Sequence, residues 1–420
     1  MVKKCIAILK IGKRKGCRCN RRLAKNNPDY CKKHKHLQPV KNPPTEDSSC
    51  AYNKVGEGTY GCVFKPPLPC KGKLCKDSED VCATGVSKLM TKQDARKQLS
   101  EYQHMDKFDP EHQYHLGKPY ICQPDKKAVN LKRIKTKCKS KYSDKFNAML
   151  IYPDGGVDLY TILNQDADIR EYTNAELEIG LLNIFYGVYI MNNSDHYHLD
   201  LKTENIVVLS NGKNKIPKVR LIDFGIAYHW NETKLHKFSS VYANNYFAWP
   251  FELRLLSLEC DEDELSDEID EYLAKQPLLL LTENNIETFE RLYAEKYQKC
   301  YQIFARHYDD DDDELDTDGL LSDPEYIEMA KYAIHKVDVY SLGILLFNMS
   351  QAIETKLPPD LFIIANPGQP GQKSTVTNKI RLTAHQAYKL YRHYLLRRYD
   401  VETNTNRKRD LDFISSFPEE

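Results

Sequence analysis

The chain has 420 residues, of which 41% are hydrophobic and 29% are charged, and its formal net charge is +1. This length predicts two or three compact units, and the hydrophobic share is sufficient for packed cores. The charge balance averages unequal regions, because residues 1–44 hold fourteen Lys or Arg against one acid, whereas 259–271 and 309–318 are crowded with Asp and Glu. We therefore expect charged tails or insertions that meet charged partners.

Apolar runs and cysteines indicate the cellular location of the protein. No run approaches the roughly 18 apolar residues of a membrane-spanning helix. The N-terminal apolar patch, residues 6–9, is too short for a secretory signal. Thirteen cysteines without such a signal predict reduced thiols or metal ligands, not a disulfide framework. We expect no membrane partner and an intracellular location, cytoplasmic or nuclear, or a virion if the source is viral.

The first 44 residues combine basic side chains with Cys and His, and end in the spacing Cys-x-x-His. Thiolate and imidazole groups suit a tetrahedral Zn²⁺ site, and a metal would give so short a segment a reason to fold. The predicted ligands are Cys5, Cys31, His34 and either Cys19 or Cys17. The alternative is a disordered basic tail with incidental cysteines. In either form this segment is a candidate contact for nucleic acid or an acidic protein.

Hydrophobic periodicity and turn residues predict the elements that follow. In chain order these are a strand, glycine-rich turn and strand over 52–62, a loop over 70–80, a strand over 86–90, a helix over 92–106, a buried strand over 149–152, a helix over 175–191, a strand pair over 206–209 and 219–222, an acidic helix-rich stretch after 251, and a helix over 337–349. Strands come first and helices dominate afterwards. This order predicts an α+β protein with two unequal lobes.

A glycine-rich stretch, Val55-Gly-Glu-Gly-Thr-Tyr-Gly-Cys-Val63, lies in the first strand pair. Because glycine has no side chain, its backbone N–H groups can approach a triphosphate closely. The signal is weak by itself, since glycine triplets are common in turns. It differs from a dinucleotide-binding fingerprint, because the residues after Gly61 form a strand pattern and not a helix.

Two later motifs place charged and amide side chains that could take part in catalysis on short loops. Tyr197-His-Leu-Asp-Leu-Lys-Thr-Glu-Asn205 offers an Asp, a Lys two residues on and an Asn three further, which can serve a hydroxyl nucleophile, a phosphate and a metal. Leu221-Ile-Asp-Phe-Gly225 puts a carboxylate at a strand end, where it can hold Mg²⁺ on nucleotide oxygens.

In this order the three motifs resemble the signature of the eukaryotic protein kinase superfamily, with divergence and insertions similar to kinases of large DNA viruses. The resemblance implies a bilobal fold with a small β-rich N-lobe, 45–152, and a large, mainly helical C-lobe, 153–420. The basic module and linker, 1–44, would precede the lobes, and an acidic insertion would occupy about 255–333 of the C-lobe. The acidic run 309–313 inside that insertion is either a solvated loop or a docking site for a basic partner or for the basic N-terminus of the same chain.

The resemblance also implies roles for the motif residues. The residues that would cover the ATP phosphates are Val55, Gly56, Glu57, Gly58, Thr59, Gly61 and Val63. Lys88 takes the position of the phosphate-binding lysine, because its competitor Lys65 follows the glycine-rich stretch too soon. Glu101 is its expected ion-pair partner.

In the catalytic loop, the resemblance makes Asp200 the base for the substrate hydroxyl and Lys202 the neutraliser of γ-phosphate charge. Asn205 and Asp223 would hold Mg²⁺. Lys202 after Asp-Leu favours a serine/threonine kinase, so the expected activity is ATP-dependent phosphorylation of protein Ser or Thr. The alternatives are a small-molecule kinase, or a catalytically weak kinase-fold scaffold or binding module that uses the basic N-terminus.

Several positions depart from the family pattern. Leu199 stands where most members have Arg, so an activating phosphate on the segment that follows would lack its usual partner. We expect aromatic packing by Phe238, Tyr242, Tyr246 and Trp249 to order this segment, and the kinase to be active without phosphorylation. The alternative is that Lys234 or Lys237 replaces the missing Arg. Pro250-Phe-Glu252 resembles a diverged Ala-Pro-Glu motif, and Asp338-Val-Tyr-Ser-Leu-Gly343 resembles the start of a C-lobe helix.

Overall fold

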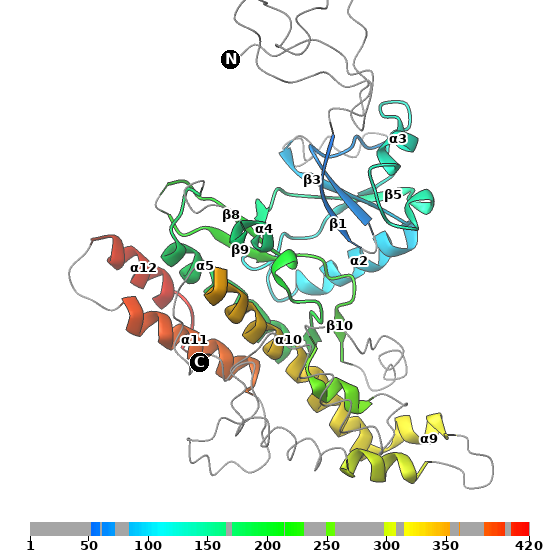
Figure 1. The fold of residues 1–420 in the computed structure, drawn as a ribbon, viewed down its shortest axis with the longest axis vertical. Coiled ribbons are helices and arrows are strands. Elements are labelled where there is room, and N and C mark those ends of the chain that lie inside the picture. The colour runs from blue at the N-terminus through cyan, green and yellow to red at the C-terminus, as the bar shows by residue number, and fades with distance from the viewer. Residues whose placement is uncertain are drawn as a thin grey trace, which may run out of the picture. The chain divides into compact units, whose positions relative to one another are not determined.

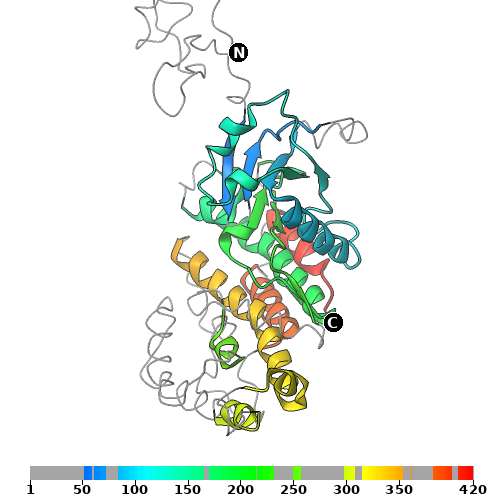
Figure 2. The ribbon, with the colours of Figure 1, turned by 90° about the vertical axis from the view of Figure 1, so that its right-hand side faces the viewer.

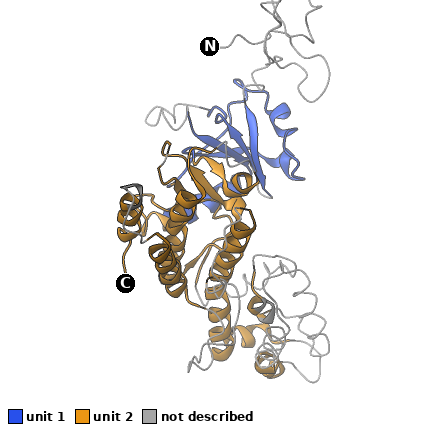
Figure 3. Ribbon diagram, turned by 60° about the vertical axis from the view of Figure 1, so that its left-hand side comes forward, with its two compact units in different colours: residues 1–103, 117–154 blue, residues 104–116, 155–420 orange. Residues whose placement is uncertain are grey.

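The fold comes from a computed structural model of the whole chain. It describes residues 52–58, 61–71, 84–164, 170–213, 215–230, 249–256, 298–307, 315–352, 361, 382–399 and 405–419. The chain forms two compact units, one of residues 1–103 and 117–154 and the other of residues 104–116 and 155–420 (Figure 3). Both contain helices and strands, as the predicted α+β class requires.

The first unit is built on an antiparallel sheet with strand order β1-β2-β3-β5-β4. Its strands are β1 (Asn53–Gly58), β2 (Gly61–Lys65), β3 (Val86–Met90), β4 (Tyr120–Cys122) and β5 (Ala148–Tyr152). Helix α2 (Lys92–Met105) follows β3, so the predicted strands and helix of this region are confirmed. At Gly61 a Cβ atom would lie 2.7 Å from the carbonyl oxygen of Leu89, which makes glycine necessary where β2 meets β3.

The segment between β4 and β5, residues 123–147, contains a short helix, α3 (Leu131–Lys135), and a 3₁₀ turn over Ser143–Lys145. We call it the β4–β5 segment. Ile134 and Phe146 are fully buried and share one apolar cluster with Phe64 of β2. Burial of these side chains packs the segment against the β1–β2 hairpin.

Two disulfides cross-link the same region, Cys62–Cys138 and Cys70–Cys122. The prediction of reduced thiols was therefore wrong for these four residues. The partners are 76 and 52 residues apart in sequence, so the pairing is decided by the sheet and not by local spacing. Among the described cysteines, Cys300 is buried and takes no part in these two disulfides.

The second unit is built mainly of helices, both long and short (Figures 1 and 2). They are α4 (Leu159–Leu163), α5 (Asn174–Asn193), α9 (Thr317–Ser322), α10 (Pro324–Ala352), α11 (Ala384–Tyr399) and α12 (Thr405–Ser415). Helix α5, predicted over 175–191, is buried on most faces and packs on α10 and α11. Phe185 of α5 stacks on Tyr391 of α11 with ring centroids 4.1 Å apart. None of the described helices is both long and apolar enough to cross a bilayer.

Short strands form two small sheets in this unit. One sheet has the order β6-β8-β9 and the other pairs β7 with β10. The strands are β6 (Val157–Asp158), β7 (His196–Tyr197), β8 (Ile206–Leu209), β9 (Lys218–Leu221) and β10 (Tyr228–His229). β8 and β9 form the predicted antiparallel pair.

Helix α10 begins earlier than predicted. Asp338 is not at its start, because the helix runs from Pro324, where proline suits the first helical position. The Asp323 carboxylate precedes it and accepts a hydrogen bond from the Glu325 amide at 2.8 Å. The last part of the predicted insertion, 324–333, is therefore helical, as predicted for the stretch after 251, and it has buried residues such as Tyr326 and Ala330.

Candidate active site

Three predicted site residues meet in one hydrogen-bonded cluster of the second unit, in the loop between β7 and β8. Lys202 Nζ lies 2.8 Å from Asp200 Oδ1. Asn205 Nδ2 donates to Asp200 Oδ2 and to the Asp200 carbonyl, both at 2.8 Å. Asp200 and Lys202 are partly exposed while Asn205 is buried, so the cluster combines a fixed carboxylate with access from solvent.

Asp223, the fourth predicted residue, lies in the loop after β9 of the same unit. The preceding amide, that of Ile222, donates to the Asn205 carbonyl at 2.9 Å, which ties the two loops together. His198 Nε2 lies 3.1 Å from the Ile222 carbonyl and forms a second tie. Asp223 has φ of +63°, a left-handed conformation that non-glycine residues rarely adopt. Strain of this kind persists only where the surroundings enforce it, and it clusters at functional sites.

A buried carboxylate on α10 fixes the loop between β7 and β8 by hydrogen bonds to its backbone. Asp338 is fully buried, and its Oδ2 and Oδ1 accept the amides of His198 and Leu199 at 2.8 and 2.9 Å. Asn192 Nδ2 at the end of α5 donates to the same Oδ2 at 3.0 Å. Asp338 therefore joins α5, α10 and the loop, a role that the sequence did not indicate.

Leu199, at the position where the family resemblance leads one to expect Arg, lies in an apolar environment. It is buried in a cluster with Trp249, Leu253 and Val337, and its φ is +60°. Its carbonyl accepts a hydrogen bond from Trp249 Nε1 at 2.7 Å. Trp249 is thus fixed on the loop that contains Asp200. The other predicted packing residues, Phe238, Tyr242 and Tyr246, lie outside the described part of the chain.

The predicted phosphate-covering residues lie on the β1–β2 hairpin of the first unit. Val55, Gly56, Glu57 and Gly58 belong to β1. Gly61 and Val63 belong to β2. Thr59 lies outside the described residues, as do all the predicted zinc ligands.

Lys88 and Glu101 also belong to the first unit. Lys88 is buried on the central strand β3, opposite Val63 of β2 and Leu150 of β5. Glu101 is half-buried on α2. Placing a lysine on a central strand directly beside the glycine-rich hairpin is what a phosphate-binding role requires.

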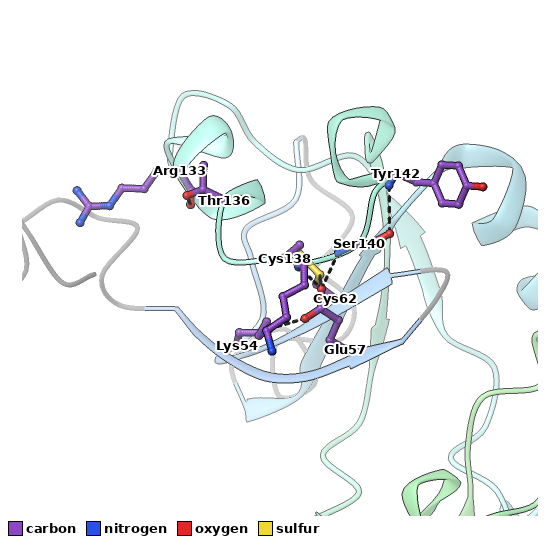
Figure 4. Close-up of a disulfide and its surroundings, with 9 residues drawn as sticks. Lys54, Glu57, Cys62, Arg133, Thr136, Cys138, Ser140 and Tyr142 are labelled. Carbon is purple, nitrogen blue, oxygen red and sulfur yellow. Dashed lines mark hydrogen bonds and ion pairs between the residues drawn. A yellow bond between two sulfur atoms is a disulfide. The ribbon is translucent and has the colours of Figure 1, made fainter. Parts of the chain in front are cut away.

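Glu57 has neighbours that sequence reasoning missed (Figure 4). Its Oε1 accepts the amide of Ser140 at 3.0 Å and also that of Lys139, and its Oε2 pairs with Lys54 Nζ at 2.5 Å. Burial raises the pKa of the Glu57 carboxyl, but Lys54 and the two amides outweigh it, so the pKa is lowered overall. The ionised Glu57 thus fastens the glycine-rich strand to the β4–β5 segment.

Comparisons with known proteins add little to this geometry. No family model and no curated protein matches the chain. Among solved structures the chain is similar to titin kinase and its flanking domains, at 15% sequence identity and a TM-score of 0.27. The similarity covers 43% of this chain and 26% of that one, so the chain spans about a quarter of that structure. A TM-score this low carries no argument about fold or activity.

Proposed function

We propose that the protein is an ATP-dependent protein kinase with a bilobal kinase fold that phosphorylates Ser or Thr. The observation that carries the proposal is the cluster of Asp200, Lys202 and Asn205, with Asp223 on the adjoining loop. A carboxylate held by an amide and a cation, beside a second carboxylate, is the arrangement that phosphoryl transfer to a hydroxyl requires.

The oxygens present suit Mg²⁺, which prefers carboxylate and amide oxygen ligands. Asn205 turns its nitrogen to Asp200, which leaves its carbonyl oxygen as the metal-facing atom. The Asp223 carboxylate would supply the second ligand. Mg²⁺ would neutralise charge on the nucleotide phosphates when bound.

Each residue then has one task. Asp200 accepts the proton of the substrate hydroxyl, and Asn205 keeps that carboxylate oriented. Lys202 carries a positive charge 2.8 Å from Asp200 and stabilises the negative charge that develops on the transferred phosphoryl group. Lys88 and the hairpin glycines would bind the ATP phosphates. Leu199 and Asp338 position the loop without contacting the reactants.

The proposal predicts different defects for Asp200→Asn and Asp223→Asn. Asp200→Asn should lower phosphotransfer by about 10²–10⁴ while ATP binds normally, because the general base alone is lost. Asp223→Asn should weaken Mg²⁺-ATP binding as well. The measurements are phosphate transfer to a basic protein and calorimetric ATP binding.

Glu204→Gln is the matched control, since Glu204 is an exposed carboxylate of the same loop. It should keep wild-type activity. ATP binding without phosphotransfer in the wild-type protein would favour the scaffold alternative, and full activity in both aspartate variants would exclude the kinase assignment.

A further inference from the structure

The β4–β5 segment carries a dense positive charge that the proposed catalytic function does not use. Between residues 126 and 145 there are nine Lys or Arg and one acid, Asp144. The exposed cations are Lys126, Lys127, Lys132, Lys139, Lys141 and Lys145. Like charges at this density repel one another, so a surface that keeps them is a candidate for a polyanion.

The segment is folded and does not behave as a charged tail. Lys137 Nζ donates to the Tyr52 carbonyl at 2.6 Å, and Lys135 Nζ donates to the Asp144 carbonyl at 2.7 Å. The Cys62–Cys138 bond attaches it to β2 (Figure 4). The exposed lysines are therefore presented by a fixed backbone, which lowers the entropy cost of binding a ligand there.

A hollow of about 630 Å³ lies between β1 and residues 139–142. Its lining includes the cations Lys54, Lys139 and Lys141, the carboxylate Glu57 and the ring of Tyr142. The Tyr142 residue is 42% exposed and points away from the disulfide (Figure 4). Lys141 Nζ and Lys145 Nζ lie 5.1 and 5.7 Å from the centroid of its ring. An exposed aromatic ring with two cations close to it thus borders the hollow.

We propose that this surface binds single-stranded nucleic acid, with lysines on the phosphates and Tyr142 stacked on a base. Proteins that bind single strands without sequence preference combine these two features, a positive groove and an aromatic platform. An acidic peptide without aromatic residues would satisfy the lysines but offers no flat ring to cover Tyr142. A duplex keeps its bases stacked on one another, so it can use the lysines but not the ring. The proposal does not rest on the catalytic cluster of the second unit, and its hollow shares the strand β1 residues 55–58 with the hairpin proposed to cover ATP.

The test measures fluorescence anisotropy of a labelled oligothymidylate of about 15 nucleotides with the full-length chain. Salt is varied between about 50 and 200 mM, because phosphate contacts make affinity salt-dependent. Lys139→Ser with Lys141→Ser should weaken binding about tenfold and make the salt slope shallower by about one. Tyr142→Ala should weaken single-strand binding about tenfold and leave duplex binding unchanged.

Lys92→Ser with Lys97→Ser is the matched control, because it removes two exposed lysines of α2 in the same unit. It should change the affinity less than twofold. This control matters because the basic residues 1–44 also attract polyanions.

Three results would overturn the proposal. One is an equal loss in the control and in the Lys139/Lys141 variant, which would assign binding to general charge. The second is insensitivity of single-strand binding to Tyr142→Ala. The third is tighter binding of a polyglutamate peptide than of the oligothymidylate, which would make the partner an acidic protein.

Discussion

Asp338 illustrates how a single side chain positions the proposed catalytic loop. Its two oxygens accept three hydrogen bonds, two of them from consecutive backbone amides. A carboxylate can do this because all of its lone pairs are acceptors, whereas an amide side chain has only one oxygen. Leu199 is held in a left-handed conformation by these contacts, so the loop geometry depends on Asp338.

We therefore expect Asp338→Asn to disturb both stability and activity. Its NH₂ group would face a backbone N–H, and a buried donor would lose its acceptor, which should cost about 2–4 kcal/mol of unfolding free energy. Denaturant unfolding and kcat measure the two effects. Ser350→Ala on the same helix is the control, since Ser350 Oγ bonds only the backbone carbonyl of Phe347 and should contribute within about 0.5 kcal/mol. Unchanged kcat and stability in Asp338→Asn would contradict the anchoring role.

Leu199 and Trp249 lead to a prediction about activation by phosphorylation. Because Leu199 is buried beside Trp249, which donates to its carbonyl, no guanidinium is present at this position to receive a phosphate. We expect the joint replacement of Thr233, Ser239, Ser240 and Tyr242 by non-phosphorylatable residues to change kcat less than about tenfold. Phosphatase treatment of the wild-type protein should have the same small effect. A larger loss in both experiments would show that phosphorylation activates the enzyme and that another cation, such as Lys234 or Lys237, replaces the arginine.

At the scale of elements, the β1–β2 hairpin is held from one side by the β4–β5 segment. Glu57 and Cys62 are opposite each other in the β1–β2 register, and both are tied to consecutive residues of that segment, Cys138 and Lys139. A glycine-rich hairpin would otherwise be mobile, since glycine loses most conformational entropy on folding. The cross-links thus restrict the strand that is proposed to cover ATP.

Removing each disulfide separately should distinguish a loss of overall stability from a loss of order in the β1–β2 hairpin. Cys62→Ser and Cys70→Ser should each cost about 2–4 kcal/mol of unfolding free energy, because each bond closes a long loop in the unfolded chain. Only Cys62→Ser should also speed amide hydrogen exchange in residues 56–58, because Cys62 lies on the hairpin beside Glu57. Equal exchange in both variants would mean that Glu57 alone fixes the hairpin.

At the scale of the whole molecule, buried histidines make stability depend on pH. Burial, the largest cause in each case, lowers the pKa of His115 and of His196 to about 4. His115 is fully buried, with Asp109 Oδ2 at 3.5 Å and Asp106 Oδ1 at 3.9 Å, and His196 packs against His104 and His229. Both imidazoles are therefore neutral in the folded protein at neutral pH.

The sign of the change in stability with pH follows from the number of protons bound by the folded and the unfolded chain. Between pH 6.5 and about 4 the unfolded chain holds more protons on these histidines than the folded chain, so the folded state loses stability as pH falls. The slope should approach about 1.4 kcal/mol per pH unit for each proton taken up. Denaturant unfolding from pH 7 to 4.5 measures it. His115→Gln should flatten the slope while the exposed His393→Gln should not, and a slope unaffected by His115→Gln would contradict this account.

The sequence by itself determined the local elements and the chemical groups of the proposed site. Glycine spacing predicted the β1–β2 hairpin, helical periodicity predicted α5, and the run from His198 to Asn205 placed an acid, a cation and an amide on one short loop. These features depend on neighbours within a few residues, where periodicity and turn chemistry are decisive.

Only the tertiary structure decided what holds these groups in place. Asp338 lies 138 residues after Asp200, and Cys138 lies 76 residues after Cys62, so no local pattern indicates either contact. The same holds for Leu199. The sequence shows only that Leu replaces the expected Arg, and the structure adds that Trp249 donates a hydrogen bond to its carbonyl. Such contacts depend on which buried surfaces meet when helices and strands pack together. That choice is made by the whole set of burial and hydrogen-bond free energies, to which residues far apart in sequence contribute jointly.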